Sequence, residues 1–339
     1  MKNLLIEFMD RKISVYDPYA GSSLENEITL CYIDVLSTCN LACPSCPVGN
    51  MKKVPGTIMD SDKFEKIIIK LKNEYQHLVE IGLYNWTEPL LHPKLSEFIK
   101  VVKDAGFSCT MSTNLNYLGK LEDVVKSEPN ILRISLSGFE QKTYEKGHKK
   151  GNIETVKQNM KILADFIKKY NSKTKVVVLY LKYKHNISDI PAMKEFAQML
   201  GFEFEEYWAY LMPVEKNLEY IETPEKIDPE TKEIINSLEI EPTEHLKILE
   251  PYKKDRCLLI ENQLVINAAG EIELCCASYN PLYTNKNFLD LTPEEIRDLR
   301  HKNDLCEKCM KHGINMIYST VIGDSDLKHH SERITKILG

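Results

Sequence analysis

The sequence predicts an α/β fold in which parallel strands alternate with covering helices. Three observations support this prediction: six β-rich runs alternate with helical patterns, cysteines and polar residues follow the ends of several runs, and hydrophobic residues make up 43% of the 339 residues. Strands that alternate with helices pair in parallel, because each helix carries the chain back to the same end of the sheet. Periodicity alone leaves open whether this sheet is flat or curls into a barrel.

The strands are predicted where short runs are rich in β-branched and aromatic residues, namely at 28–36, 78–84, 107–112, 131–136, 175–182 and 202–208. The helices are predicted where apolar residues recur every three or four positions, namely at 61–74, 94–105, 117–126, 153–170 and 190–200. In the first helix, Phe64, Ile67 and Leu71 share one face and are candidates for the core.

Changes in composition divide the chain into five predicted segments: an N-terminal hairpin or cap at 1–27, the α/β unit at 28–208, a connector at 209–254, a smaller unit at 255–325 and a terminal helix at 326–339. Runs 4–8 and 12–16 predict the first hairpin. Prolines and acidic residues interrupt the connector, which predicts one or two short helices. In the smaller unit, runs 264–267 and 271–275 flank an Ala-Ala-Gly turn, which predicts a second β-hairpin.

Charge and hydropathy restrict the partners. The net charge is −6 with acids and bases well mixed, so no electrostatic footprint for nucleic acid is present. The basic run 146–150 is typical of a solvated face. No apolar run is long enough to span a membrane, and the N-terminus lacks a signal-peptide pattern. We therefore expect a cytoplasmic protein without nucleic-acid or membrane partners, and ten cysteines are too sparse for a disulfide scaffold.

Three cysteines directly after the first predicted strand carry the clearest chemical signal. Cys39, Cys43 and Cys46 form a C-x3-C-x2-C run. Three such thiolates can hold three irons of a [4Fe–4S] cluster and leave the fourth iron open for chemistry. The alternative is structural zinc, which needs four ligands. No cysteine or histidine between Cys46 and His77 completes such a site locally.

This run resembles the signature of the radical S-adenosylmethionine (radical SAM) superfamily. The resemblance implies a partial (β/α)6 barrel and an open iron that chelates the methionine end of S-adenosylmethionine. After the second strand, the segment 84–93 is similar to the family's Gly-Gly-Glu-Pro segment, with Trp86 and Thr87 where glycines are common. Glu88 is the matching acid, and the resemblance implies that Glu88 and the backbone at Thr87 hold the amino group of S-adenosylmethionine.

Two further segments follow the third and fourth strands. Residues 112–114 are similar to the family's Thr-Asn-Gly segment and supply Asn114. Residues 135–138 are similar to its Ser-x-Asp-Gly segment and supply Ser135, with Ser137 in place of the acid. The resemblance implies that these side chains bind the ribose and carboxylate of S-adenosylmethionine.

A second group of five cysteines lies near the C-terminus. This region resembles the twitch extension, a shortened SPASM domain, and the resemblance implies an auxiliary [4Fe–4S] cluster with four ligands: Cys257, Cys275, Cys306 and Cys309. Zinc held by the same residues is the alternative. Cys276 is adjacent to Cys275 and points the other way in an extended strand, so it is an alternative ligand, a buried apolar residue or a hydrogen-atom donor. Cys31 and Cys109 lie within predicted strands and are expected in the core.

The resemblance implies a flavodoxin or ferredoxin as electron donor, reductive cleavage of S-adenosylmethionine and abstraction of a substrate hydrogen atom. We expect an oxidoreductase that dehydrogenates a sugar-like or other small-molecule alcohol, with the auxiliary cluster as electron acceptor. One alternative is a peptide-modifying enzyme that forms a thioether, a C–C crosslink or an epimer. A second alternative is an epimerase that uses Cys276 as hydrogen-atom donor. A third alternative is a zinc-stabilised, non-enzymatic binding module.

Overall fold

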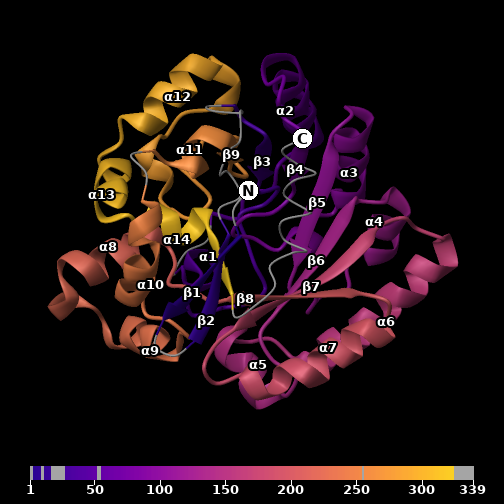
Figure 1. Cartoon of the computed structure of the whole chain (residues 1–339). Helices are drawn as coiled ribbons and strands as arrows, with labels where there is room; N and C mark the ends of the chain where they lie inside the picture. The colour runs from indigo at the N-terminus through magenta and orange to yellow at the C-terminus, as the bar shows by residue number, and fades with distance from the viewer. Residues whose placement is uncertain (1–2, 9–10, 17–26, 52–54, 254–255, 324–339) are drawn as a thin grey trace.

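The main sheet of the protein contains seven parallel strands. The computed structural model describes residues 3–8, 11–16, 27–51, 55–253 and 256–323 (Figure 1). In spatial order the strands are β8 (Glu203–Trp208), β7 (Lys175–Lys182), β6 (Ile131–Leu136), β5 (Ser108–Thr113), β4 (Glu80–Gly82), β3 (Leu30–Ile33) and β9 (Gln263–Ile266). The predicted α/β class and partial barrel are confirmed, because the curved sheet is open between β8 and β9 within the described residues.

Helices cover the outside of the sheet between successive strands (Figure 1): α2 (Ser61–Glu74), α3 (Leu95–Asp104), α4 (Leu121–Ser127), α5 (Gln141–Gly147), α6 (Ile153–Tyr170) and α7 (Ile190–Met199). Asp60 caps α2 by accepting a hydrogen bond from the Lys63 N–H, and Asn152 caps α6 in the same way. The sequence did not predict α5. It is short, and Tyr144 is its only large buried side chain, so no apolar periodicity marks it.

The seventh strand corrects the predicted hairpin at 264–275. All four residues of β9 are buried, and the strand pairs in parallel with β3 from Leu30↔Gln263 to Ile33↔Ile266. The local turn does form, since the Asn267 N–H donates to the Glu271 carbonyl (2.9 Å), but the return leg is reduced to isolated bridges. A strand buried on both faces is typical of a parallel sheet. The C-terminal part of the chain therefore completes the main sheet.

The segment 209–254 is more structured than predicted. It contains three α-helices instead of one or two: α8 (Val214–Glu222), α9 (Pro229–Ser237) and α10 (Pro242–Leu249). The prolines start these helices and do not interrupt them, because a first-turn proline lacks only an N–H that would be unpaired anyway. Buried Leu218 and Leu249 pack with Trp208 of β8 and with Ile317, so this segment has its own apolar core.

The remaining α-helices are short: α1 (Pro47–Asn50), α11 (Leu258–Asn262), α12 (Pro293–His301), α13 (Asp304–His312) and α14 (Asn315–Ser319). Single 3-10 turns occur at η1 (Pro89–Leu91), η2 (Ile187–Asp189), η3 (Pro224–Lys226), η4 (Glu250–Tyr252), η5 (Pro281–Tyr283) and η6 (Phe288–Asp290). No helix in the described ranges combines the length and the apolar character that crossing a membrane requires.

The predicted N-terminal hairpin is confirmed as β1 (Asn3–Phe8) paired antiparallel with β2 (Arg11–Tyr16). A third strand, β10 (Val321–Gly323), pairs with β2 and also contacts β8. The hairpin is thus tied to the C-terminal part of the chain, which meets the edge of the main sheet. The helix predicted at 326–339 lies outside the described residues, and the predicted segment boundaries stay predictions.

Candidate functional site

A cavity of about 340 Å³ lies at the carboxyl ends of the parallel strands. All three loop cysteines line it, together with four of the five predicted polar residues: Cys39, Cys43, Cys46, Thr87, Glu88, Asn114 and Ser135. Residues separated by almost a hundred positions therefore meet at one place. Ser137 is the predicted residue that does not line the cavity.

Local contacts fold the cysteine loop back on itself. The side-chain amide of Asn50 donates to the carbonyls of Cys43 (2.7 Å) and Cys46 (2.8 Å). Gly49 lies so close to the loop that a Cβ at this position would be 2.9 Å from the Cα of Ala42. Burial raises the pKa of the Cys39 thiol to about 12 and also raises the pKa of the other two thiols. The loop thus presents three half-buried sulfur donors to the cavity, and as free thiols they are protonated.

Asp34 organises the neighbouring loop and was not singled out from the sequence. Its carboxylate accepts hydrogen bonds from the Asn85 N–H (2.9 Å), the Trp86 N–H (3.2 Å) and the Thr87 hydroxyl (2.6 Å). These bonds hold the segment 85–87 although Trp86 and Thr87 replace glycines. Burial raises the pKa of Asp34 to about 6. An acid directly after a buried strand was the available signal.

Glu88 ties the ends of β4 and β5 together at the cavity. Its Oε1 accepts from the Leu90 N–H (3.0 Å) and its Oε2 accepts from the Asn114 N–H (2.8 Å). Burial raises the pKa of Glu88 to about 7. Each carboxylate oxygen has a second lone pair, so the group can also accept from a bound ammonium. A cation at this site would favour the ionised carboxylate.

Asn114 joins the end of β5 to the cysteine loop. Its Nδ2 donates to the side-chain oxygen of Asn40 (2.9 Å) and lies 3.8 Å from the Cys39 sulfur.

The Nδ2 of Asn85, which also lines the cavity, is buried and has no hydrogen-bond partner among the described residues. A buried donor without a partner at a cavity is suited to a polar ligand. Three thiols and these polar groups fit a cluster with bound S-adenosylmethionine.

Ser137, which was predicted to bind S-adenosylmethionine, lies outside the lining of the cavity. Its hydroxyl is fully buried and lies 2.7 Å from Nδ1 of His148. His148 itself lines the cavity, stacks on Tyr144 with ring centroids 5.0 Å apart, and has a pKa that burial lowers to about 4. The imidazole is therefore neutral. The sequence offered no signal for His148, because it lies in the basic run that predicted a solvated face.

Replacing Ser137 with alanine is expected to lower stability by about 1–3 kcal/mol, because His148 loses its buried partner. Binding of S-adenosylmethionine should change less than in Ser135→Ala, whose side chain lines the cavity. Denaturant unfolding and equilibrium binding of S-adenosylmethionine separate the two effects. A loss of binding in Ser137→Ala larger than in Ser135→Ala would contradict this assignment.

The C-terminal cysteines gather around a second, much smaller cavity of about 20 Å³. Four of them line it: Cys257, Cys275, Cys306 and Cys309. Cys306 and Cys309 lie one turn apart on α13, so both face the cavity. Cys276 does not line it. The described residues contain no group of three His, Cys, Asp or Glu side chains placed to hold a single metal ion. Thiolates of a [4Fe–4S] cluster bind different irons and do not converge on one ion.

An aromatic pair lies between the two cavities. Tyr210 lines the large cavity, Tyr318 lines the small one, and their rings meet edge to face with centroids 5.3 Å apart. The Tyr318 hydroxyl donates to the Leu211 carbonyl (2.8 Å). Burial raises the pKa of Tyr210 to about 12, and the nearby Cys276 thiol adds to that rise. Cys276 thus lies near Tyr210, although it does not line the large cavity itself.

Comparison with known proteins gives one family and several similar folds. Residues 33–197 match the model of the Radical SAM superfamily. A tungsten-containing aldehyde ferredoxin oxidoreductase cofactor-modifying protein of Pyrococcus furiosus is 32% identical over 83 residues, which are 24% of this chain and 23% of that protein. Its own activity therefore does not transfer to this chain.

Two solved structures share the fold. Streptococcus suis SuiB bound to precursor peptide SuiA aligns with a TM-score of 0.55 at 15% identity, over 83% of this chain and 66% of SuiB. The protein anSMEcpe with bound AdoMet and Cp18Cys peptide aligns with a TM-score of 0.52 at 14% identity, over 81% of this chain and 82% of that chain. The family match spans the cysteine loop and the strand ends around the large cavity, so residues 33–197 are similar to a radical SAM domain.

Proposed function

We propose that the protein binds a [4Fe–4S] cluster through Cys39, Cys43 and Cys46, cleaves S-adenosylmethionine reductively and removes a hydrogen atom from its substrate. One observation carries this proposal: the three thiols line the same cavity as Glu88 and Asn114. A flavodoxin- or ferredoxin-type protein would supply the electron. The bound cofactors supply the one-electron chemistry and the 5′-deoxyadenosyl radical.

The residues around the cavity bind and orient the cofactor. The Glu88 carboxylate accepts hydrogen bonds from the ammonium group of S-adenosylmethionine. Asn114 and Ser135 donate hydrogen bonds to its carboxylate and ribose. Asp34 fixes the backbone at 85–87 and keeps that wall in register with the cysteine loop. Tyr210 and the other apolar lining exclude water, which protects a reactive radical from side reactions.

We propose that the reaction is the two-electron dehydrogenation of a sugar-like or other small-molecule alcohol. The first electron would leave with the abstracted hydrogen atom and the hydroxyl proton would go to solvent, while an auxiliary [4Fe–4S] cluster, if bound, would supply the acceptor for the second electron. Cys257, Cys275, Cys306 and Cys309 are the proposed ligands of that cluster. The short aromatic connection from Tyr210 to Tyr318 supports this assignment, because it brings the two cavities close together.

The test is a metal and product analysis of anaerobically prepared full-length protein. About eight irons per chain, together with 5′-deoxyadenosine after addition of dithionite and S-adenosylmethionine, is the expected result. About four irons per chain, with cleavage intact, would show that the auxiliary cluster is absent. This result would also refute the proposed oxidation step, which depends on that cluster. Zinc without iron and without cleavage would instead favour the non-enzymatic binding module.

Peptide modification is the second candidate. SuiB, solved with a precursor peptide, and anSMEcpe, solved with a bound peptide, share the fold of this chain. A candidate alcohol and a candidate peptide are each added to the reduced enzyme, and the substrate that raises 5′-deoxyadenosine formation is analysed by mass. A loss of two mass units supports dehydrogenation or crosslinking, whereas epimerisation leaves the mass unchanged. An epimerase would lose its product, but not cofactor cleavage, in Cys276→Ala.

The affinity for S-adenosylmethionine should fall as the pH is lowered from 7.5 to 5.5. The buried Glu88 has a raised pKa of about 7, so below that pH a bound ammonium must first displace a proton from the carboxyl group. The affinity should therefore fall by up to about tenfold per pH unit. Isothermal titration of cluster-loaded protein measures it.

Two variants control this experiment. Glu88→Gln should bind more weakly and show little pH dependence, because it has no carboxyl group to deprotonate. Glu97→Gln, an exposed acid on α3, should follow the wild-type curve. Equal pH dependence in wild type and Glu88→Gln would refute the role of Glu88.

A further inference from the structure

Arg300 of α12 is an unusual residue because it is a fully buried cation. Its side chain is only 1% exposed. Its Nε donates to the Leu274 carbonyl (2.8 Å) and its Nη2 donates to the Leu259 carbonyl (3.1 Å). These neutral partners satisfy donors but do not cancel the positive charge. Burying an arginine is costly, so such a residue calls for a compensating negative group.

The groups around Arg300 that would become negative on binding a cluster are cysteine thiols. Leu259 and Leu274, whose carbonyls bind the guanidinium, line the small cavity together with the four cysteines, and Leu274 directly precedes Cys275. Burial lowers the pKa of Arg300, and the nearby Cys275, Cys257 and Cys306, followed by Tyr75, oppose that shift, with no carboxylate among these leading partners. The guanidinium is therefore anchored beside the cavity that we assign to the auxiliary cluster.

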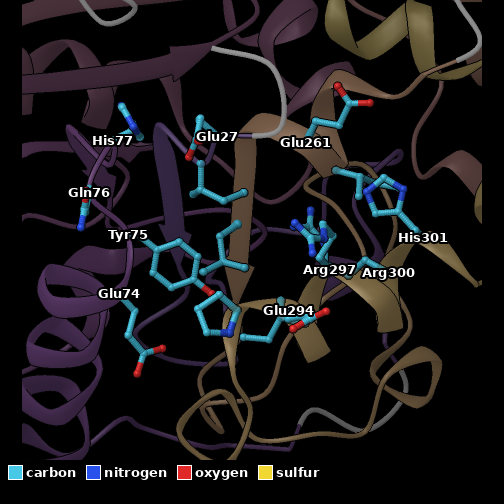
Figure 2. Close-up of a pocket in the computed structure, with 15 residues that line it drawn as sticks. Glu27, Glu74, Tyr75, Gln76, His77, Glu261, Glu294, Arg297, Arg300 and His301 are labelled. Atoms are coloured by element: carbon cyan, nitrogen blue, oxygen red, sulfur yellow. The ribbon is translucent and has the colours of Figure 1, made fainter.

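The opposite side of Arg300 faces a separate cavity of about 420 Å³ at the amino ends of the strands. Figure 2 shows Arg297, Arg300 and His301 on one side of this cavity and Tyr75 on the other. Glu261 also lines it, but its carboxylate pairs with Arg256 (2.5 Å) and is turned away from Arg300 in Figure 2. Glu27, Glu74 and Glu294 also line this cavity, but none of them is among the leading charge partners of Arg300, so its charge remains available to the cysteines.

We propose that Arg300 raises the reduction potential of the auxiliary cluster, an inference that rests on the proposed function because it requires that cluster. A [4Fe–4S] cluster with four thiolates gains one unit of negative charge when it accepts one electron. A fixed cation nearby stabilises the reduced form more than the oxidised form, and the low dielectric of a buried site preserves this effect. Charge and hydrogen bonding around a cluster set its potential. Arg300 is a positioning residue that makes the cluster a better acceptor for the second electron.

The experiment measures the potential and not turnover. Full-length protein carrying Cys39→Ala, Cys43→Ala and Cys46→Ala, so that only the auxiliary cluster assembles, is reconstituted with iron and sulfide. The midpoint is read by electron paramagnetic resonance during titration with dithionite. In Arg300→Gln the equilibrium constant for reduction should fall at least about tenfold, which is about 59 mV for one electron. Arg300→Lys should stay near the parent value, and so should Arg297→Gln, an exposed residue on the same helix.

The outcomes separate the two proposals. Absence of a cluster in the parent protein would overturn the auxiliary site itself. A cluster that loads normally in Arg300→Gln with an unchanged midpoint would overturn the inference alone. A shift in Arg300→Lys as large as that in Arg300→Gln would also overturn it, because the cause would then be the guanidinium hydrogen bonds and not the charge. If Arg300→Gln does not load iron, Arg300→Met is reconstituted in its place, and an unchanged midpoint in that uncharged variant would overturn the inference.

Discussion

Cys39→Ala is expected to abolish cleavage of S-adenosylmethionine and to lower the iron content by about four atoms per chain. Cys39 lines the large cavity with Cys43 and Cys46, and Asn114 approaches its sulfur. The wild-type site offers only three protein ligands for four irons. The two thiolates that are left in Cys39→Ala are too few to retain the cluster. Iron analysis and quantification of 5′-deoxyadenosine after anaerobic reconstitution measure both effects.

Cys109→Ala is the matched control. Cys109 is fully buried in β5 and does not line the cavity. This variant should keep the iron content and the cleavage, at a cost of about 1–2 kcal/mol in stability. Circular dichroism of both variants checks that each is folded. If Cys39→Ala retained the iron and the cleavage of the wild type, Cys39 would not be a ligand.

Asp34→Ala is expected to lower the free energy of unfolding by about 3–5 kcal/mol and to remove cofactor cleavage with it. The substitution leaves the Asn85 and Trp86 amides and the Thr87 hydroxyl without their shared acceptor, and Asp34 is 6% exposed, so water does not readily replace it. Asp34→Asn keeps one acceptor oxygen and should lose less. Denaturant unfolding of the apoprotein measures the difference.

The same residue predicts a pH dependence of stability. Burial raises the pKa of Asp34 from an ordinary value near 4 to about 6 in the folded protein. Its contribution is therefore fully present below about pH 4 and is lost as the pH rises through 6, by roughly 2–3 kcal/mol. Asp34→Asn should lack this component. Asp60→Ala, which removes an exposed helix cap, should lower the stability and keep the wild-type dependence between pH 4 and 6.

Much of the fold could be predicted because its signals are local. Periodic apolar residues mark α2 and α6, and β-branched runs mark β6 and β7, within windows of a few residues. The predicted turn after 264–267 and the antiparallel bridge Ile266↔Ile272 do form, but the sequence did not predict the parallel partner β3, because a partner over 200 positions away leaves no local signal. The prolines near α9 and α10 were misread because a proline that starts a helix and one that breaks a helix look alike in composition.

By itself, the sequence identified the residues whose spacing carries chemistry: the three loop cysteines, Glu88 after the second strand and the C-terminal cysteine group. It also predicted that they follow strand ends and therefore meet at one edge of a parallel sheet. The tertiary structure was needed to find Asp34 and His148, to exclude Ser137 from the cavity and to place Cys275, not Cys276, beside the other three cysteines. These facts depend on contacts between distant segments and on burial. Local patterns contain neither, because burial and hydrogen-bond partners arise only when the elements pack together.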